Sequence, residues 1–175
     1  MESTTIFRTD AAEIIAKKIM QTVNLEDYVV LCIGSSDVVS DSLGPQIGSL
    51  LTSRPGTRVM IYGTNDVNVN AGNLSTALDF VRDMHPDKKI FVVDAAVGDS
   101  TEVGCVQLIE GGIVPGAATN RVLPRVGDIS LIGVVSMRGA KNFYASHFDR
   151  VSLVKKMAEV IANSIARAAG NTETA

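Results

Sequence analysis

The sequence predicts an α/β fold, namely a three-layer α/β/α sandwich with a central mixed, mostly parallel sheet. Short apolar runs alternate along the chain with segments in which apolar residues recur every three or four positions. Polar residues rarely interrupt the apolar runs, which is typical of strands that are buried on both faces. Right-handed crossovers between parallel strands then place helices on both faces of the sheet.

Helical periodicity predicts four helices, and continuous apolar runs predict five strands. No helical segment separates the third strand from the fourth, so we expect the fourth to run antiparallel at an edge of the sheet. The Gly- and Pro-rich stretch before the last strand is expected to form an ordered loop. The helices are 10–23, 43–51, 73–84 and 148–169, the strands are 28–33, 59–62, 90–93, 103–109 and 129–135, and the loop is 111–127.

With 175 residues, the chain has the length of one domain with its own core, here 1–175, and a polar tail is expected from about residue 170. The net charge of −3 provides no basic surplus, so no nucleic-acid partner is expected. The first ten residues are polar and no apolar run approaches the ~20 residues of a membrane span. We therefore expect no targeting segment, no membrane partner and a cytoplasmic location.

The two cysteines, Cys32 and Cys105, both lie in apolar runs. They are too few for a disulfide framework or a complete zinc site. We expect both to be buried as small apolar side chains, in a reducing compartment.

In a sheet of this kind, binding sites form beyond the carboxyl ends of the strands, where the strand order reverses. The segments to consider are therefore 34–45, 63–72 and 94–100. The first could be a phosphate-binding loop, since it leads from a strand into a helix. It lacks the G-x-G-x-x-G pattern and a lysine after glycine, and its two aspartates would repel a phosphate.

Two aspartates close strand–loop junctions of the predicted sheet. Asp41 either caps the helix that starts near Pro45 or is a carboxylate at the mouth of the sheet. Asp94 either bonds the next loop as a simple strand-end acid or lies beside Asp41. Adjacent strands are ~4.8 Å apart, so two such carboxyl groups could meet in one cleft.

A close pair of carboxyl groups shares one proton over a broad pH range, because the two cannot both ionise cheaply. One member can then activate water while the other donates a proton, which is the chemistry of amide hydrolysis without a covalent intermediate. Asp37 and Asp99, from the same loops, are weaker candidates and are equally explained as solvated loop acids.

The sequence disfavours catalysis by a serine or cysteine nucleophile. The chain has no G-x-S-x-G element, and Cys32 lies in mid-strand. Neither His85 nor His147 is next to a candidate nucleophile in sequence.

Three asparagines follow the second strand, and they either line the cleft as substrate-binding groups or serve turn geometry. They are Asn65, Asn68 and Asn70. Close approach of the backbone is expected at Gly34, Gly44 and Gly98.

Four segments are specific enough to indicate a family. They read CIGSSDVVSDSLGPQIG, IYGTNDVNVNAGNL, FVVDAAVG and PGAATNRVLPRVGDISLIGVVS. In this order they resemble the sporulation protein YyaC family over most of the chain, from about Tyr28 to the final helix. That family is related to the germination protease of spore-forming bacteria and, more distantly, to the hydrogenase maturation proteases, so the resemblance implies their three-layer α/β/α fold.

The resemblance also implies roles for two residues. Asp41 lies in D-S-L-G-P, which matches a D-A-L-G-P element of the germination protease, and Asp94 matches its I-D-A element. There the two acids are the implicated catalytic pair and the substrates are small acid-soluble spore proteins. In the hydrogenase maturation proteases the same positions bind nickel with a histidine, but the matching segment here, 115–127, contains none; no metal or other cofactor is therefore expected.

We therefore expect a peptidase of a spore former, in the cytoplasm or the forespore, with Asp41 and Asp94 as its catalytic pair and a protein or peptide as its substrate. The first alternative is a binding or regulatory protein of sporulation that kept the fold and the acids. A further alternative is a nickel-dependent maturation endopeptidase. The high apolar content also makes a homo-oligomer a plausible partner arrangement.

Overall fold

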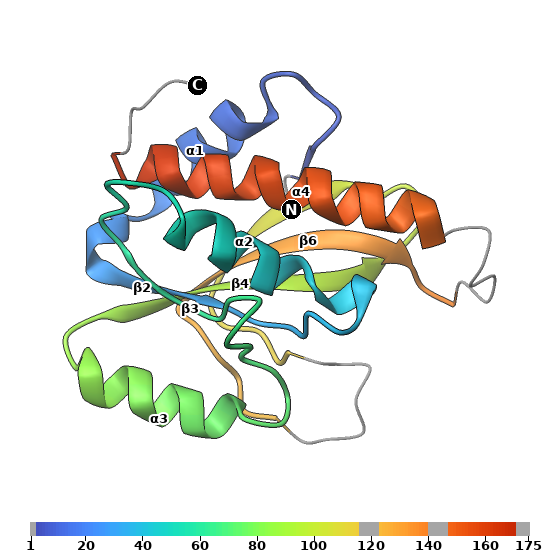
Figure 1. Ribbon diagram of the computed structural model, residues 1–175. Helices are drawn as coiled ribbons and strands as arrows, with labels where there is room; N and C mark the ends of the chain where they lie inside the picture. The colour runs from blue at the N-terminus through green and yellow to red at the C-terminus, as the bar shows by residue number, and fades with distance from the viewer. Residues whose placement is uncertain (1–2, 116–122, 140–146, 171–175) are drawn as a thin grey trace.

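A computed structural model describes residues 3–115, 123–139 and 147–170 as a six-stranded sheet between two helical layers (Figure 1). Side chains are described from Arg150 onward in the last helix. The strand order is β1-β5-β6-β4-β2-β3. The elements are β1 (Ser3–Thr5), α1 (Ala11–Thr22), the 3-10 turn η1 (Leu25–Asp27), β2 (Tyr28–Cys32), the 3-10 turn η2 (Val39–Asp41), α2 (Leu43–Thr52), β3 (Met60–Tyr62), α3 (Leu74–Met84), β4 (Lys89–Gly98), β5 (Cys105–Glu110), β6 (Ile129–Met137) and α4 (His147–Ala168).

The sheet is mixed and mostly parallel, as the sequence predicts. β2 pairs in parallel with β3 and β4, and β4 with β6, whereas β5 is antiparallel to both of its neighbours. The antiparallel direction of β5 is therefore confirmed, but its expected place at an edge is wrong, because β1 covers its outer side. β1 was not predicted, since Ser3–Thr5 is short and polar and shows no strand pattern.

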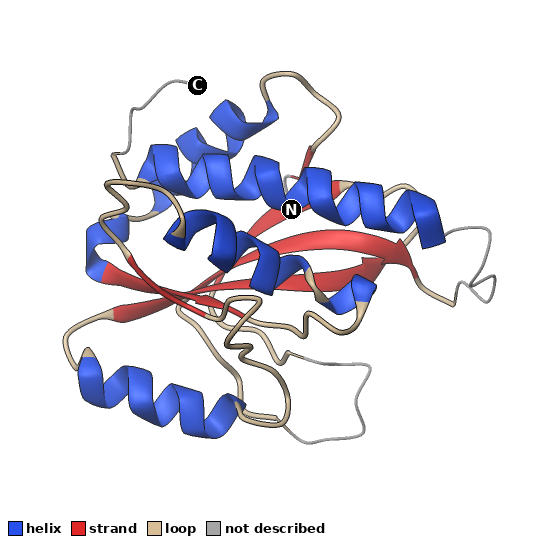
Figure 2. Cartoon of the chain, in the orientation of Figure 1, coloured by secondary structure: helices blue, strands red, loops and turns tan. Residues whose placement is uncertain are grey.

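The helices form the outer layers of the predicted sandwich. Figures 1 and 2 show α1, α2 and α4 on one face of the sheet and α3 on the other. Successive side chains of β4 point to opposite faces of the sheet. Phe91 and Val93 join the core under the three helices, and Ile90 and Val92 join the core over α3. No helix in the described part of the chain is long and apolar enough to cross a membrane.

The part of the 111–127 loop that the structure describes packs on the α3 side of the sheet. Ile113 and Val126 form an antiparallel bridge, and Val126 is buried beside the β4 core. The remainder of the predicted loop, residues 116–122, lies outside the described residues.

The two cysteines differ in burial. Cys32 is fully buried, as predicted, and burial raises the pKa of its thiol to about 12. Cys105 is only partly buried, which corrects the prediction, because it begins β5 opposite Thr5 in the short edge strand β1.

The most important correction concerns the predicted strand 90–93. β4 does not end at Asp94 but continues to Gly98, paired with β6 throughout and with a bulge after Ala96. The polar Asp94 interrupts the apolar run, so the sequence pattern predicts that the strand ends there. The backbone hydrogen bonds to β6 nevertheless continue past it. Asp94 therefore lies inside a strand and not in a loop.

The backbones of three elements touch at Gly63, which follows β3. A Cβ atom added to Gly63 would lie 1.9 Å from the carbonyl oxygen of Cys32 in β2, and one added to Gly48 of α2 would lie 1.9 Å from the carbonyl oxygen of Gly63. The helix and the loop after β3 thus pack directly on the sheet, without side chains between them.

Replacing Gly63 with alanine tests this packing, with Gly111→Ala as the matched control. Both glycines have similar left-handed φ angles, +88° and +92°, but no atom lies within 4 Å of a Cβ added at Gly111. The strain of a left-handed alanine, about 1–2 kcal/mol, therefore affects both variants. Because only Gly63→Ala also creates a backbone clash, we expect it to lose about 2 kcal/mol or more beyond the control in urea unfolding. Equal losses would contradict the packing argument.

Candidate active site

The candidate site lies where β2 and β4 separate. β2 pairs with β4 up to Cys32 and Val93, and the N–H of Ile33 donates one more bond, of 2.8 Å, to the carbonyl of Val93. The N–H of Gly34 faces the other neighbour and donates to Val69 in the loop after β3. The next N–H on the β4 side, of Ser35, donates instead to the carbonyl of Asp41, so the chain leaves β4 at this point. With β3 on one side of β2 and β4 on the other, this gap is the topological switch point of the sheet.

Asp94 is the first residue of β4 beyond this separation. Its side chain is 6% exposed, and the N–H of Ala95 donates a 2.8 Å hydrogen bond to its Oδ1. Burial raises the pKa of Asp94 to about 7, helped by the negative charge of Asp41, and the Ala95 N–H opposes the rise. Asp94 is thus a carboxyl group that keeps its proton close to neutral pH.

Asp41 approaches from η2, the turn that precedes α2. The N-terminal capping position of α2 is occupied by Ser42, which makes no side-chain cap bond, so the interpretation of Asp41 as a helix cap is wrong. The Asp41 side chain is partly buried, which raises its pKa, and the backbone N–H of Ser35 opposes that rise. Ser35 also donates its N–H to the carbonyl oxygen of Asp41 at 3.0 Å, which closes the loop on itself.

The two carboxyl groups ionise at different pH. The charge of Asp41 contributes to the raised pKa of Asp94, and of the two shifts only that of Asp94 is large, reaching about 7. Asp94 is therefore still protonated, and so uncharged, over the pH range in which Asp41 loses its proton. Between the two ionisations the site holds one carboxylate and one carboxylic acid.

Small residues bring η2 and α2 against the sheet. A Cβ atom added to Gly34 would lie 2.0 Å from the carbonyl oxygen of Asp41, and one added to Gly44 would lie 2.1 Å from that of Ile33. At Gly133 of β6 it would lie 2.5 Å from Leu43, the first residue of α2. The predicted close approach is therefore present at Gly34 and Gly44, and Gly133 is a supporting residue that sequence reasoning missed.

Gly98 differs from these two glycines. A Cβ atom there would meet the side chains of Glu102 and Val134, at 2.6 and 2.9 Å, and not backbone.

The side chains of Asn68 and Asn70 form hydrogen bonds within and between the loops. Asn68 accepts from the N–H and hydroxyl of Ser36, at 2.9 and 3.1 Å, and donates to the carbonyl of Thr64 at 2.7 Å. Asn68 therefore joins the loop after β2 to the loop after β3. Asn70 accepts from the N–H of Gly72 within its own turn. The turn interpretation thus accounts for both side chains.

Asn65 stands apart from the other two. It lines a surface groove of about 360 Å³ between α2 and α4, together with Gln46, Ser49, Leu50, Ser53, Lys155 and Glu159. Its N–H donates to the hydroxyl of Ser49 at 2.9 Å, which ties the loop after β3 to α2.

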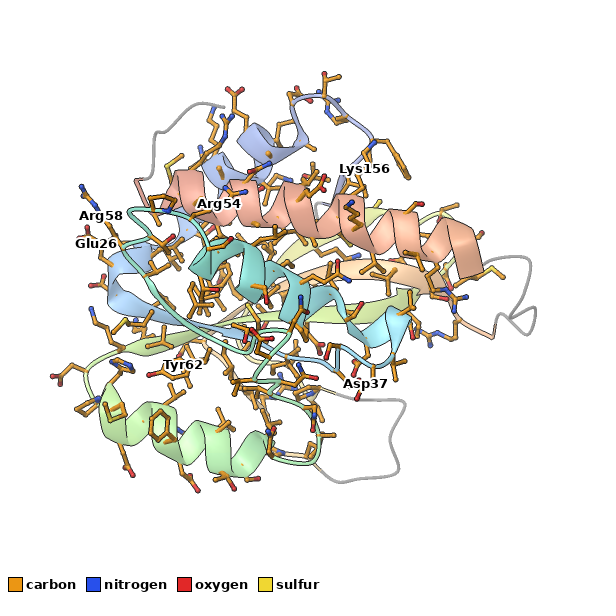
Figure 3. The ribbon with its side chains drawn as sticks, viewed as in Figure 1. Glu26, Asp37, Arg54, Arg58, Tyr62 and Lys156 are labelled. Carbon is orange, nitrogen blue, oxygen red and sulfur yellow. The ribbon has the colours of Figure 1, made fainter. Side chains whose placement is uncertain are left out.

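The two further acids lie at the surface. Asp37 is exposed on the loop that follows β2 (Figure 3). Asp99 is exposed in the turn after β4, five residues beyond Asp94, so it lies roughly 16 Å away at ~3.3 Å per residue. The structure therefore places neither of them in the buried pair.

The described side chains do not fit a nickel site. No group of three or more His, Cys, Asp or Glu side chains gathers as metal ligands among them. Imidazole nitrogen is the ligand that suits nickel, and His85 instead bonds the hydroxyl of Tyr62 at 2.8 Å, at the opposite end of the sheet from Asp94. The side chain of His147 lies outside the described residues.

Fold and site together define an α/β/α protein with a protonated, buried aspartic acid at the switch point of a mixed sheet. Residues 4–164 match the family described as "Protein of unknown function (DUF1256)", and the chain belongs to that family. It is 34% identical over 137 residues to the "Uncharacterized protein YyaC" of Bacillus subtilis (strain 168), which covers 78% of this chain and 67% of that protein. The resemblance of the sequence motifs to the YyaC family is thus confirmed.

The raised pKa of Asp94 predicts a pH-dependent penalty on stability. The folded state binds this proton more tightly than the unfolded chain, where the pKa returns to its ordinary value near 3.8. The unfolded state therefore releases the proton first as pH rises, and folded stability falls from about pH 4 to about pH 7, by roughly 4 kcal/mol in all. Asp94→Asn should remove this penalty while keeping an oxygen for the Ala95 N–H.

Urea unfolding of the wild type and Asp94→Asn across this pH range measures the effect. The stability advantage of the variant should grow up to about pH 7 and stay constant above it. Asp79→Asn, an exposed change on α3, should show no such trend. A difference between wild type and Asp94→Asn that does not vary with pH would contradict the burial of an acid at this position.

The influence of the Asp41 charge on Asp94 predicts how Asp94 responds to Asp41→Asn. Removing the charge of Asp41 should lower the pKa of Asp94, while burial keeps it above the ordinary value. Carbon NMR titration of labelled aspartate side chains reads this pKa directly, and Asp79→Asn is again the control. An Asp94 pKa that is unchanged in Asp41→Asn shows that the two carboxyl groups do not interact.

Proposed function

We propose that this protein hydrolyses peptide bonds, with Asp41 and Asp94 activating a water molecule. The observation that carries the proposal is the unequal pair at the switch point: a buried carboxyl group with a pKa of about 7 beside a second carboxyl group that ionises first. Pairs whose environments push their pKa values apart supply an acid and a base at the same pH. The resemblance of the D-S-L-G-P and V-D-A elements to the germination protease supports the same assignment.

The ionisation order assigns the roles. The carboxylate of Asp41 accepts a proton from water as the water oxygen bonds to the scissile carbonyl carbon, and the Asp94 carboxyl group donates its proton to the carbonyl oxygen. The proton on Asp41 then passes to the amide nitrogen as the C–N bond breaks. Asp94 recovers its proton from a hydroxyl group of the tetrahedral intermediate, so the pair returns to its starting state.

The resemblance also suggests where to look for substrates. A relative of the germination protease in a spore former points to proteins of sporulation or germination, and the small acid-soluble spore proteins are the first to test. The compartment would then be the cytoplasm, including that of the forespore.

A cleavage assay tests the proposal. Wild type, Asp41→Asn and Asp94→Asn are incubated with small acid-soluble spore proteins and with a diverse peptide mixture, and the products are read by mass spectrometry. Loss of either acid should reduce kcat/KM by roughly 10²–10⁴-fold, because each variant lacks one proton-transfer group. Asp79→Asn, which leaves the pair intact, should cleave at the wild-type rate.

The pH dependence distinguishes the acid from the base. Wild-type kcat/KM should fall as pH rises through about 7, where Asp94 loses the proton that it must donate. Cuts that persist in both variants would contradict the Asp pair. No cuts from folded wild type on either substrate set would favour the binding alternative.

A further inference from the structure

The separation of β2 from β4 leaves one side of β4 open. In the residues that the structure describes, β4 beyond Val93 pairs with β6 on one side only, from Asp94 to Gly98. The carbonyl of Val93 faces β2, since it accepts from Ile33. Strand backbone groups alternate with a period of two, so Ala95 faces the same side. Its N–H is taken by Asp94 Oδ1, and its carbonyl oxygen faces the gap.

This open edge runs beside the two carboxyl groups. η2, which carries Asp41, lies next to β4, and Asp94 is the first residue of the open stretch. From Asp94 to Gly98 the edge extends over roughly 13 Å, enough to pair with four or five residues of an extended chain. Val97 on the edge and Val38 on the facing loop are each about half exposed, at 49% and 51%, and offer apolar contacts on both sides.

The surroundings of the edge are acidic. The segments 33–42, 63–72 and 94–104 contain six acidic residues and no lysine or arginine. Outside the buried pair these are Asp37, Asp66, Asp99 and Glu102. A basic residue, Arg138, lies at the far end of the edge, where its N–H donates to the carbonyl of Gly98 at 2.8 Å. A chain with basic side chains would therefore be favoured at this edge, and an acidic one disfavoured.

A second observation points into the gap. Asp94 is 6% exposed, yet only its Oδ1 has a hydrogen bond among the described residues. Within the described part of the chain its other oxygen is therefore a buried polar atom without a partner, and such atoms are stabilised when a ligand supplies one. A peptide group lying along the edge brings that partner.

We propose that the open edge of β4 binds an extended, basic segment of polypeptide as an added strand, with one of its carbonyl groups held between Asp41 and Asp94. This names the substrate class of the proposed peptidase and rests on that function for the cleavage step alone. Main-chain hydrogen bonds provide the affinity in this mode of recognition, and the acidic rim selects the charge. The bound segment must be unfolded, since its own backbone has to be free to pair.

Peptide binding to Asp94→Asn tests the added strand without cleavage. The probe is a fluorescein-labelled peptide of about eight residues, enough to cover the edge with flanks, that contains lysine, valine and alanine. Single N-methyl groups are moved along it, and anisotropy gives each Kd. Methyl groups at alternate positions should weaken binding roughly tenfold, because those N–H groups pair with the edge, and the positions between should tolerate them. Equal losses at every position, or none, would overturn strand addition.

The charge preference has its own controls. A peptide with glutamate in place of lysine should bind more weakly, and the difference should shrink at high salt. Asp37→Asn, Asp99→Asn and Glu102→Gln should each weaken the lysine peptide by roughly two- to fivefold, while Asp79→Asn should not. Equal Kd values for the two peptides would overturn the basic preference. Asp41→Asn serves as a second cleavage-deficient background for the same measurements.

The outcomes separate this inference from the proposed function. Alternating N-methyl effects in Asp94→Asn, together with no cleavage by wild type, would leave the edge as a peptide-binding site and overturn hydrolysis. Cleavage by wild type that is insensitive to N-methyl position outside the scissile bond would support hydrolysis and overturn pairing with β4.

Discussion

Direct contact between backbones at the end of β2 is the constraint on which the site depends. A Cβ atom would have no room at three glycines: at Gly34 it would meet the carbonyl of Asp41, at Gly44 that of Ile33, and at Gly63 that of Cys32. A side chain at any of these positions would push α2 and its preceding turn outward. Asp41 lies on that turn, so these glycines determine whether Asp41 is close enough to Asp94 to influence its pKa.

The buried carboxyl group of Asp94 lowers the stability of the fold at neutral pH. Asp94 follows Val92 and Val93, both fully buried, and the strand continues past it because β6 supplies the ladder. The same packing that excludes water from the strand withholds solvation from the carboxyl group, and the Ala95 N–H compensates only in part. A functional role explains why an acid is kept at a position where asparagine would be more stable at neutral pH.

The spacing of apolar residues predicts the helices and strands that are buried regularly. It does not predict the strand segments that form only because a neighbouring strand pairs with them. All four helices and five of the six strands follow from apolar spacing. β1 forms because its backbone pairs with β5. β4 continues beyond its apolar residues because its backbone remains paired with β6. Asp41 and Asp94 could be named because each follows an apolar run of the sequence, although Asp94 lies inside β4 and Asp41 in η2. The role of Asn68 could not, since its bond to Ser36 joins loops 32 residues apart.

One feature of the topology accounts for both the carboxyl pair and the open edge. The chain leaves β4 at Ser35, whose N–H donates to Asp41, just where β4 continues beside β6, so the backbone of β4 loses a neighbour next to an acidic residue. Had β2 continued, Ala95 would have a strand partner. Had β4 stopped at Asp94, as its apolar pattern suggests, the acid would be solvated and its pKa ordinary. The unequal lengths of two neighbouring strands thus create a buried proton donor and, beside it, a backbone edge that an extended chain can occupy.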